Sequence, residues 1–155
     1  MVQWLSDDEQ ETWQAYVRLR QRLDAALAAG LAGDGLSPAD YELLVALSAA
    51  PEDCLRAKEL AAEVCWEKSR LSKHLARMAT RGLVDRRPAA DDARGIIVRL
   101  TPAGRRAIER AAPNHVQLVR KLFIEPMTAG EAEAVRSLAD KVVPEAERVT
   151  DVGTA

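Results

Sequence analysis

Apolar residues recur every three or four positions along most of the chain, which is the spacing of an α-helix with one buried face. The first such stretch opens at Ser6, which forms a capping box with Glu9, and it ends at the glycines of 30–35. The second opens at Ser37-Pro38 and stops at Ala50-Pro51. The pattern predicts a long first helix and a second helix of about a dozen residues. The expected apolar faces are Trp13, Tyr16 or Val17, Leu19, Leu23, Leu27 and Leu31 in the first helix, and Tyr41, Leu44, Val45 and Leu47 or Ser48 in the second.

Two short helices and a β-hairpin are expected next. The helices span 56–64 and 67–81, and Gly82 ends the second of them. The β-rich stretches 83–87 and 96–100 are separated by the turn-forming residues 88–95. This order predicts a compact group of three helices followed by a hairpin with a charged tip.

Helices are also expected in the last third of the chain. Thr101-Pro102 caps a helix that Pro113 should kink or split, because proline lacks the amide hydrogen that the helix needs. A second capping box runs from Thr128 to Glu131 and opens a last helix that Pro144 interrupts. The residues 149–155 are expected to fray.

Composition supports one mainly α-helical domain with a small β-hairpin. The chain has 155 residues, 48% of them hydrophobic and only 4% aromatic, a mixture that favours helices over a β-sandwich. No apolar run approaches the ~20 residues that cross a bilayer, so we expect a cytoplasmic protein without a membrane partner. Cys54 and Cys65 lie in no metal-binding pattern, and we expect both to be reduced, with no metal site and no cofactor.

Charge is distributed unevenly along the chain. The overall formal charge is −2, but residues 1–65 carry 5 Lys/Arg against 12 Asp/Glu, residues 66–110 carry 12 against 5, and residues 111–155 carry 5 against 7. A basic segment between acidic flanks is typical of a module that faces phosphate. On charge alone, a basic face that only meets water remains the alternative.

The fourth predicted helix has two chemically different faces. Leu71, Leu75 and Met78 fall on one stripe at about 100° per residue. The opposite side carries Ser69, Arg70, Lys73 and Arg77. An exposed helix of this kind suits the major groove of DNA, where arginine can grip guanine with two hydrogen bonds. Helix, turn, helix and then a basic hairpin is the arrangement of a winged helix.

The tip of the predicted hairpin holds Asp92 and Arg94, two positions apart. Both side chains can then point to the same side, so that the carboxylate holds the guanidinium in one orientation. An arginine held in this way can enter a narrow minor groove. A surface ion pair without further function is the alternative at this position.

Several segments together resemble the MarR family of bacterial winged-helix regulators. They are Leu60-Ala61, Trp66-Glu67-Lys68-Ser69-Arg70-Leu71-Ser72, Arg81-Gly82-Leu83-Val84-Asp85-Arg86, Asp92-Ala93-Arg94-Gly95 and Val98-Arg99-Leu100-Thr101-Pro102-Ala103-Gly104. The resemblance covers about 6–148 and implies a single domain, 1–155. Within it, the helices of 6–35 and 102–148 would form a dimerisation region and 37–101 a winged helix-turn-helix lobe.

The resemblance also implies which residues meet DNA. By matching position they are Lys68, Ser69, Arg70, Ser72, Lys73, His74, Arg77, Arg86 and Arg94, with Asp92 supporting Arg94. Two positions depart from the family pattern: Cys65 stands at the common turn glycine and Glu67 at the usual small cap. We expect Trp66 to pack in the core or between helices, because duplex DNA offers no unstacked base for it to stack on.

The residues and the family resemblance together predict a homodimeric regulator of transcription, a repressor of the MarR type, that binds a pseudo-palindromic operator and responds to a small molecule. The family places an effector pocket where Trp13, Tyr16 and Tyr41 would lie, although these aromatics could equally belong to the core. Alternatives are a winged-helix module that binds DNA non-specifically or binds an acidic protein, and a metal-sensing winged helix. No catalytic motif is present, so enzyme activity is not expected.

Overall fold

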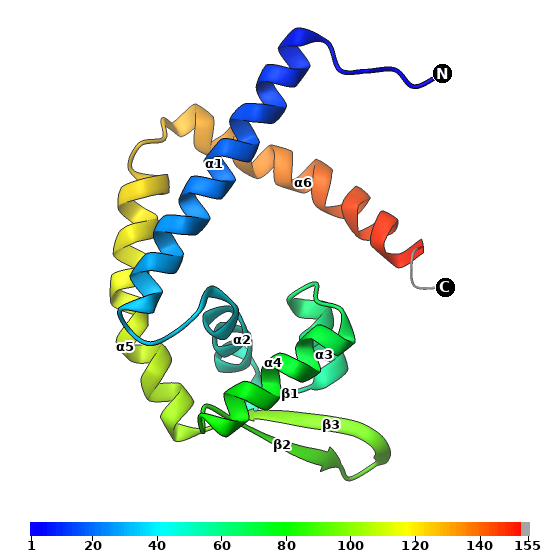
Figure 1. Cartoon of the computed structure of the whole chain (residues 1–155), viewed down its shortest axis with the longest axis vertical. Helices are drawn as coiled ribbons and strands as arrows, with labels where there is room; N and C mark the ends of the chain where they lie inside the picture. Colours follow the sequence, from blue (N-terminus) through cyan, green and yellow to red (C-terminus); the bar gives the residue numbers. More distant parts are fainter. Residues whose placement is uncertain (153–155) are drawn as a thin grey trace. The chain divides into compact units, whose positions relative to one another are not determined.

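The computed structural model describes residues 1–152 (Figure 1), and it divides the chain into two compact units, Met1–Val116 and Gln117–Ala155. The first unit holds helices α1 (Asp7–Ala32), α2 (Pro38–Ala49), α3 (Ala57–Glu63), α4 (Lys68–Thr80) and most of α5 (Pro102–Val119). A short 3-10 turn, η1 (Pro51–Asp53), follows α2. The second unit holds the end of α5, the π-helical turn η2 (Arg120–Ile124) and α6 (Ala129–Val152). The predicted mainly α-helical fold with a small hairpin is confirmed.

The helix starts follow the capping signals of the sequence. The Ser6 hydroxyl accepts from the Glu9 N–H, and the Glu9 carboxylate accepts from the Ser6 N–H at 2.8 Å. Ser37 caps α2 in the same way, with Asp40 as its partner three positions later. The predicted starts of these two helices are therefore confirmed.

The sheet has three antiparallel strands in the order β1-β3-β2. The hairpin strands are β2 (Val84–Ala89) and β3 (Asp92–Leu100), so the expected turn over 88–95 was too long. Only two residues separate the strands, because the pairing continues past Pro88 and shifts register next to Ala89. The third strand, β1 (Cys54–Arg56), was not predicted; three residues are too few for an alternating pattern to stand out.

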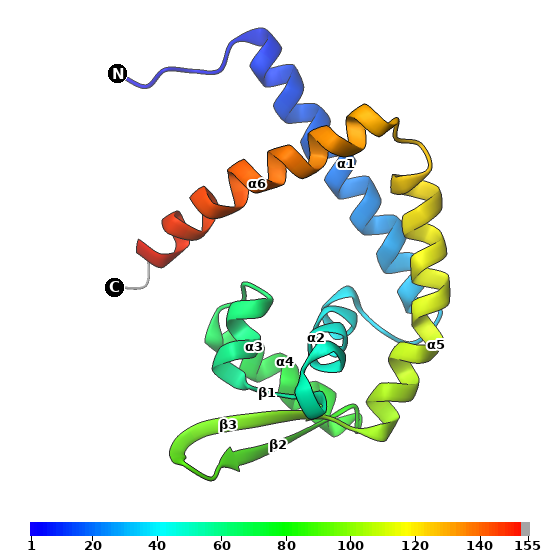
Figure 2. The same ribbon diagram turned by 180° about the vertical axis from the view of Figure 1, so that it is seen from behind.

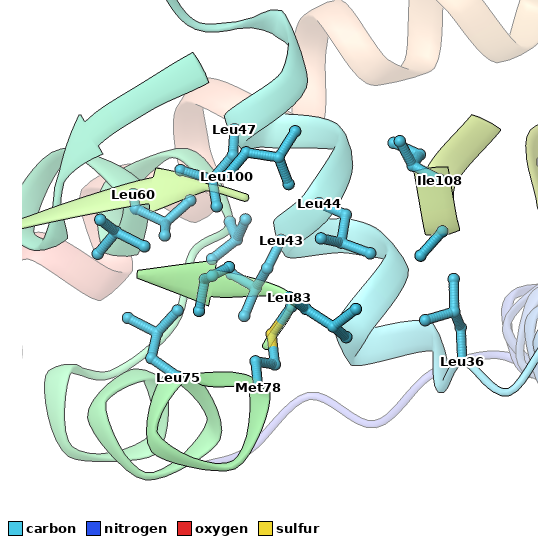
Figure 3. Packing of buried hydrophobic residues seen from close by; sticks show 14 of the residues in the cluster. Leu36, Leu43, Leu44, Leu47, Leu60, Leu75, Met78, Leu83, Leu100 and Ile108 are labelled. Carbon is cyan, nitrogen blue, oxygen red and sulfur yellow. The ribbon is translucent and has the colours of Figure 1, made fainter. Parts of the chain in front are cut away.

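One hydrophobic core lies beside the sheet, among α2, α3, α4 and part of α5 (Figure 3), and Figure 2 shows the ribbons of these helices. Leu71, Leu75 and Met78 of α4 are buried in it, as the helical spacing predicted. In α2 the prediction was wrong at one position: Val45 is exposed, and Leu43 is buried instead. The fully buried large side chains are Leu43, Leu44, Leu47, Leu60, Leu71, Leu75, Met78 and Val98.

Both prolines expected to break helices lie inside continuous helices. α5 runs through Pro113, and α6 runs through Pro144 to Val152, so the predicted split and interruption are wrong. Each proline leaves one backbone carbonyl, four residues earlier, without its helical donor. Those carbonyls belong to Glu109 and Asp140, which are exposed, and water can satisfy them there.

The end of α4 and the start of α5 meet in a tight corner. Gly82 ends α4 with φ +73°, a left-handed conformation that glycine adopts without a steric penalty. The Thr101 hydroxyl donates to the Gly82 carbonyl at 2.6 Å and accepts from the Gly104 N–H at 3.0 Å. A Cβ atom on Gly104 would lie 2.1 Å from the Leu83 carbonyl oxygen. Only glycine therefore allows this approach.

Candidate nucleic-acid interface

The turn between α3 and α4 sets the direction of the candidate recognition helix. Cys65 lies in this turn with φ +54°, a left-handed conformation that is costly for any residue with a Cβ atom. A glycine, which the resemblance drawn from the sequence leads us to expect at this position, would adopt the conformation without that cost. Glu67 then caps α4, since its carboxylate accepts from the Ser69 N–H at 3.2 Å and also from the Ser69 hydroxyl.

One face of α4 is polar and exposed along its whole length. It lies opposite the buried stripe of Leu71, Leu75 and Met78, and α4 has no acidic residue in its first turn. Positive charge is therefore concentrated on this face of α4. The exposed residues of the face are Lys68, Ser69, Arg70, Ser72, Lys73 and Arg77.

Arg70 rests on a buried tryptophan. Its guanidinium carbon lies 3.8 Å from the centre of the Trp66 ring, in cation–π geometry. Trp66 is only 8% exposed and belongs to the core cluster, which confirms the prediction that it fills space between helices. The ring thus limits the directions in which Arg70 can point.

The structure does not place His74 on the exposed face of α4. The side chain is 12% exposed, and its Nε2 lies 2.8 Å from Asp40 Oδ1. Its Nδ1 lies 2.9 Å from Arg77 Nη2, and the Trp66 ring meets it edge-on. Both nitrogens are therefore occupied inside the chain, so His74 is not available to a phosphate in this arrangement.

Asp40 is the centre of this buried polar group. Its Oδ2 accepts from the Ser37 N–H at 2.9 Å and from Arg81 Nη1 at 2.7 Å, while Oδ1 faces His74. Burial by itself raises the pKa of Asp40, but the hydrogen bonds from Ser37, Arg81 and His74 outweigh burial and hold the pKa below its ordinary value. The carboxylate is therefore charged at neutral pH.

The hairpin presents further basic residues. Arg86, Asp92 and Arg94 are exposed on it. The expected side-chain pairing at the tip was wrong: the Asp92 carboxylate accepts from the backbone N–H of Arg94 at 2.9 Å, and the Arg94 guanidinium takes part in none of the ion pairs found within residues 1–152.

A different ion pair holds the tip. Arg56 Nη2 of β1 lies 2.6 Å from Asp91 Oδ1, and this contact lowers the pKa of Asp91. A Cβ on Gly95 would lie 3.1 Å from Arg56 Nη1, so the small residue leaves room for the arginine to cross. β1 therefore supports the hairpin turn from the side.

The three aromatics expected at an effector pocket lie in two places. Trp13 and Tyr16 form a ring pair on α1 with centroids 5.5 Å apart, and both are more than half exposed. Tyr41 is half-buried on α2 and packs against His115 at 4.4 Å. Trp13 and Tyr16 are therefore not core residues of this chain.

Other chemistry is limited within residues 1–152. Cys54 and Cys65 are free thiols. The described residues contain no group of three or more His, Cys, Asp and Glu side chains suited to a metal ion. Across the same residues, no helix has the length and apolar composition that crossing a bilayer requires.

Comparison with known proteins shows which family this chain belongs to. The MarR family model matches residues 34–95. The fold matches that of AbsC, a MarR family transcriptional regulator from Streptomyces coelicolor, with a TM-score of 0.88 and 34% identity over 97% of this chain and 99% of that one. The chain belongs to the MarR family of transcriptional regulators.

Two other MarR family proteins are similar over most of their length. Sco3205 from Streptomyces coelicolor, solved in complex with DNA, is 32% identical over 92% of this chain and 90% of that one, with a TM-score of 0.87. The multiple antibiotic resistance protein MarR of Escherichia coli is 26% identical over 81% of this chain and 86% of that protein. The resemblance drawn from the sequence motifs is thereby confirmed.

Several long-range contacts of this MarR family protein were not predicted from the sequence. Asp40 and Arg81 meet across 41 positions, and Arg56 meets Asp91 across 35. The only local signal was Asp40 itself, which stands three residues after Ser37 as the second half of a capping box. Tertiary contacts of this kind leave no periodic pattern.

Proposed function

We propose that this protein regulates transcription by binding a specific duplex DNA sequence, with α4 in the major groove. The observation that carries the proposal is the row of basic side chains on the exposed face of α4, backed by a fully buried stripe. Arg70 and Arg77 are suited to bidentate contacts with guanine, and Lys68 and Lys73 to phosphate. The similar protein Sco3205 was solved in complex with DNA, and a mutant MarR from Escherichia coli was solved in complex with operator DNA.

The hairpin would extend the contact to the backbone or the minor groove. Arg86 and Arg94 are exposed on it, and Arg94 is free of ion pairs within the described residues. The turn is held by Asp92 and by the Arg56 contact with Asp91. An anchored turn lowers the entropy that Arg94 would lose on binding.

We assign residues 37–101 to the DNA-binding lobe and residues 6–35 and 102–148 to dimerisation. Trp13, Tyr16 and Leu19 on α1 are each about half exposed, and so are Val135, Leu138 and Val142 on α6. Stretches of exposed apolar side chains are typical of surfaces that meet another chain. A two-fold homodimer would present two copies of α4 to a pseudo-palindromic site.

The proposal includes repression that a small molecule relieves, in the cytoplasm, with no catalytic step. Such a molecule must bind one conformation of the dimer better than the other to change DNA affinity. The aromatics Trp13 and Tyr16 offer exposed ring surface to it, and Tyr41 a half-buried one.

Selection of bound fragments from a random duplex pool, followed by titration at several salt concentrations, tests the proposal. A pseudo-palindromic site bound on the order of 10³-fold tighter than random DNA is expected. Arg70→Ala should relax base preference, whereas Arg94→Ala should weaken all sequences and reduce the salt slope by about 1. Arg18→Ala, which removes an exposed arginine outside the candidate DNA surface, serves as the control and should change neither property in protein that is shown to remain dimeric.

Two outcomes would contradict specific recognition. Uniform and steeply salt-dependent binding would mean that the basic residues read only phosphate. Absence of binding to any duplex would mean that the winged helix serves another partner, such as an acidic protein.

A further inference from the structure

A chain of side chains connects the start of α2 to an exposed arginine of α4. Asp40 Oδ1 lies 2.8 Å from His74 Nε2, and His74 Nδ1 lies 2.9 Å from Arg77 Nη2. His74 and Arg77 are three positions apart on α4, so they share one side of the helix. Asp40 is 3% exposed and Arg77 is exposed. The chain therefore leads from a buried charge to the candidate DNA surface.

The two partners of His74 fix where its proton lies. A carboxylate can only accept a hydrogen bond, and a guanidinium can only donate. Nε2 must therefore carry the proton that Asp40 Oδ1 accepts, and Nδ1 must offer its lone pair to Arg77 Nη2–H. The charged groups around the imidazole are Asp40 from α2, Arg77 from α4 and, through Asp40, Arg81.

We propose that Asp40 is a positioning residue for DNA binding, which holds Arg77 by fixing the tautomer of His74. The inference rests on the proposed function, because it assumes that Arg77 contacts DNA. An arginine held in one orientation before binding loses less rotamer freedom in the complex. Asp40 thus contributes to recognition without touching DNA itself.

The substitution Asp40→Asn tests this proton placement directly. Asp40 Oδ2 meets two donors, the Ser37 N–H and Arg81 Nη1, so the single oxygen of asparagine must take that place. The amide NH₂ then faces His74 Nε2, which must become an acceptor. The proton moves to Nδ1, which faces Arg77 as a donor and can no longer hold it.

Nitrogen-15 NMR of the histidine side chains in the full-length protein shows which ring nitrogen is protonated. We expect His74 of the wild type to be the Nε2–H tautomer and that of Asp40→Asn to be the Nδ1–H tautomer. Ser37→Ala is the matched control: it weakens the cap of α2 but leaves the Asp40 carboxylate in place, so the tautomer should not change. A wild-type His74 with its proton on Nδ1 would overturn the inference.

A double-mutant cycle on the selected operator tests the consequence for binding. In the wild type, Arg77→Ala should lower affinity roughly 10- to 100-fold. In Asp40→Asn the same change should cost at least about threefold less, because Arg77 is already released. His74→Gln, whose amide can still donate to Asp40 but offers no acceptor at the Nδ1 position, should reduce the cost in the same way, and it serves if Asp40→Asn folds poorly.

The failures of the two proposals are distinguishable. A large loss from Arg77→Ala that is equal in the wild type, Asp40→Asn and His74→Gln would overturn the positioning role and leave the proposed DNA contact intact. No loss from Arg77→Ala in any background would show that Arg77 is not a contact. That result would overturn the positioning role, whereas specific binding of the operator by the other residues of α4 would stand.

Discussion

The guanidinium of Arg70 lies on the face of Trp66, with 3.8 Å between its central carbon and the ring centre. The tryptophan is buried and the arginine exposed, so a core residue directly supports a residue of the candidate DNA surface. The same ring meets His74 edge-on. Trp66 therefore contacts one side chain that would bind DNA and another that holds a second arginine.

Replacing Trp66 should weaken DNA binding through Arg70. Cation–π contacts contribute about 0.5–1 kcal/mol at exposed sites, so Trp66→Leu should lower operator affinity about two- to fivefold in protein that remains folded. Trp66→Phe, which keeps an aromatic face, should lose less. Fluorescence anisotropy with the selected operator measures both. If Arg70→Ala costs the same in Trp66→Leu as in the wild type, the ring does not act through Arg70.

Gly104→Ala should destabilise the fold strongly. The new Cβ would lie 2.1 Å from the Leu83 carbonyl oxygen and 2.7 Å from Leu100 Cδ1, and overpacking of this kind costs about 1–3 kcal/mol. Gly130→Ala is the matched control, since no atom lies within 4 Å of a Cβ there and alanine stabilises a helix by up to about 1 kcal/mol relative to glycine. Urea unfolding should therefore give changes of opposite sign for the two variants, and equal changes would contradict this account of Gly104.

Cys65→Gly should stabilise the fold. The residue holds φ +54°, a conformation that costs a residue with a Cβ about 1 kcal/mol, and its side chain is exposed, so little packing is lost. Part of the gain is offset because glycine makes the unfolded chain more flexible. Thermal unfolding should show a higher midpoint for Cys65→Gly, whereas Cys65→Ser keeps the strain and should leave the midpoint nearly unchanged. A lower midpoint for Cys65→Gly would be evidence against strain in this turn.

Stability should fall as the pH drops below about 6.5, the ordinary pKa of histidine. Burial lowers the pKa of His115 in the folded chain, and its Nδ1 is buried without a hydrogen-bond partner. Below that pH His115 is protonated in the unfolded chain, whereas in the folded chain it stays neutral until the pH reaches its lower pKa. Proton binding therefore favours the unfolded state.

Urea unfolding from about pH 8 to about pH 5 measures this effect. His115→Gln should make stability fall less steeply over that range. At the alkaline end, its free energy of unfolding should drop only by the contribution of the packing against Tyr41. The lowered pKa of Asp40 acts at a different pH, because its stabilising effect is lost only below about 3.8. An unchanged slope in His115→Gln would exclude His115 as the titrating group.

The sequence predicts the elements whose signals are local. Capping residues such as Ser6 and Ser37 mark helix starts through bonds that span three positions, and Leu71, Leu75 and Met78 share a stripe that geometry alone defines. Gly82 ends α4 for an equally local reason, its positive φ. Such features depend on neighbours in the chain, so they can be read before the fold is known.

The remainder depends on partners far along the chain. β1 pairs along the edge of β3, and α5 tolerates Pro113 because the Glu109 carbonyl, which loses its donor there, faces water. From its position in the sequence, His74 was expected to contact phosphate. Instead it is bound by Asp40, 34 residues away, and lies mostly buried between Asp40 and Arg77. The basic face of α4 was predictable from spacing, whereas the contacts that hold its arginines were not.

The corner between α4 and α5 has a mechanical consequence. Gly104 lies against the Leu83 carbonyl, and Thr101 binds the Gly82 carbonyl, so the residues that end α4 are in direct contact with the start of α5. The start of α5 therefore contacts the residues that directly follow the helix carrying Arg77. We expect a tilt of the first turn of α5 to be passed through these contacts to the end of α4.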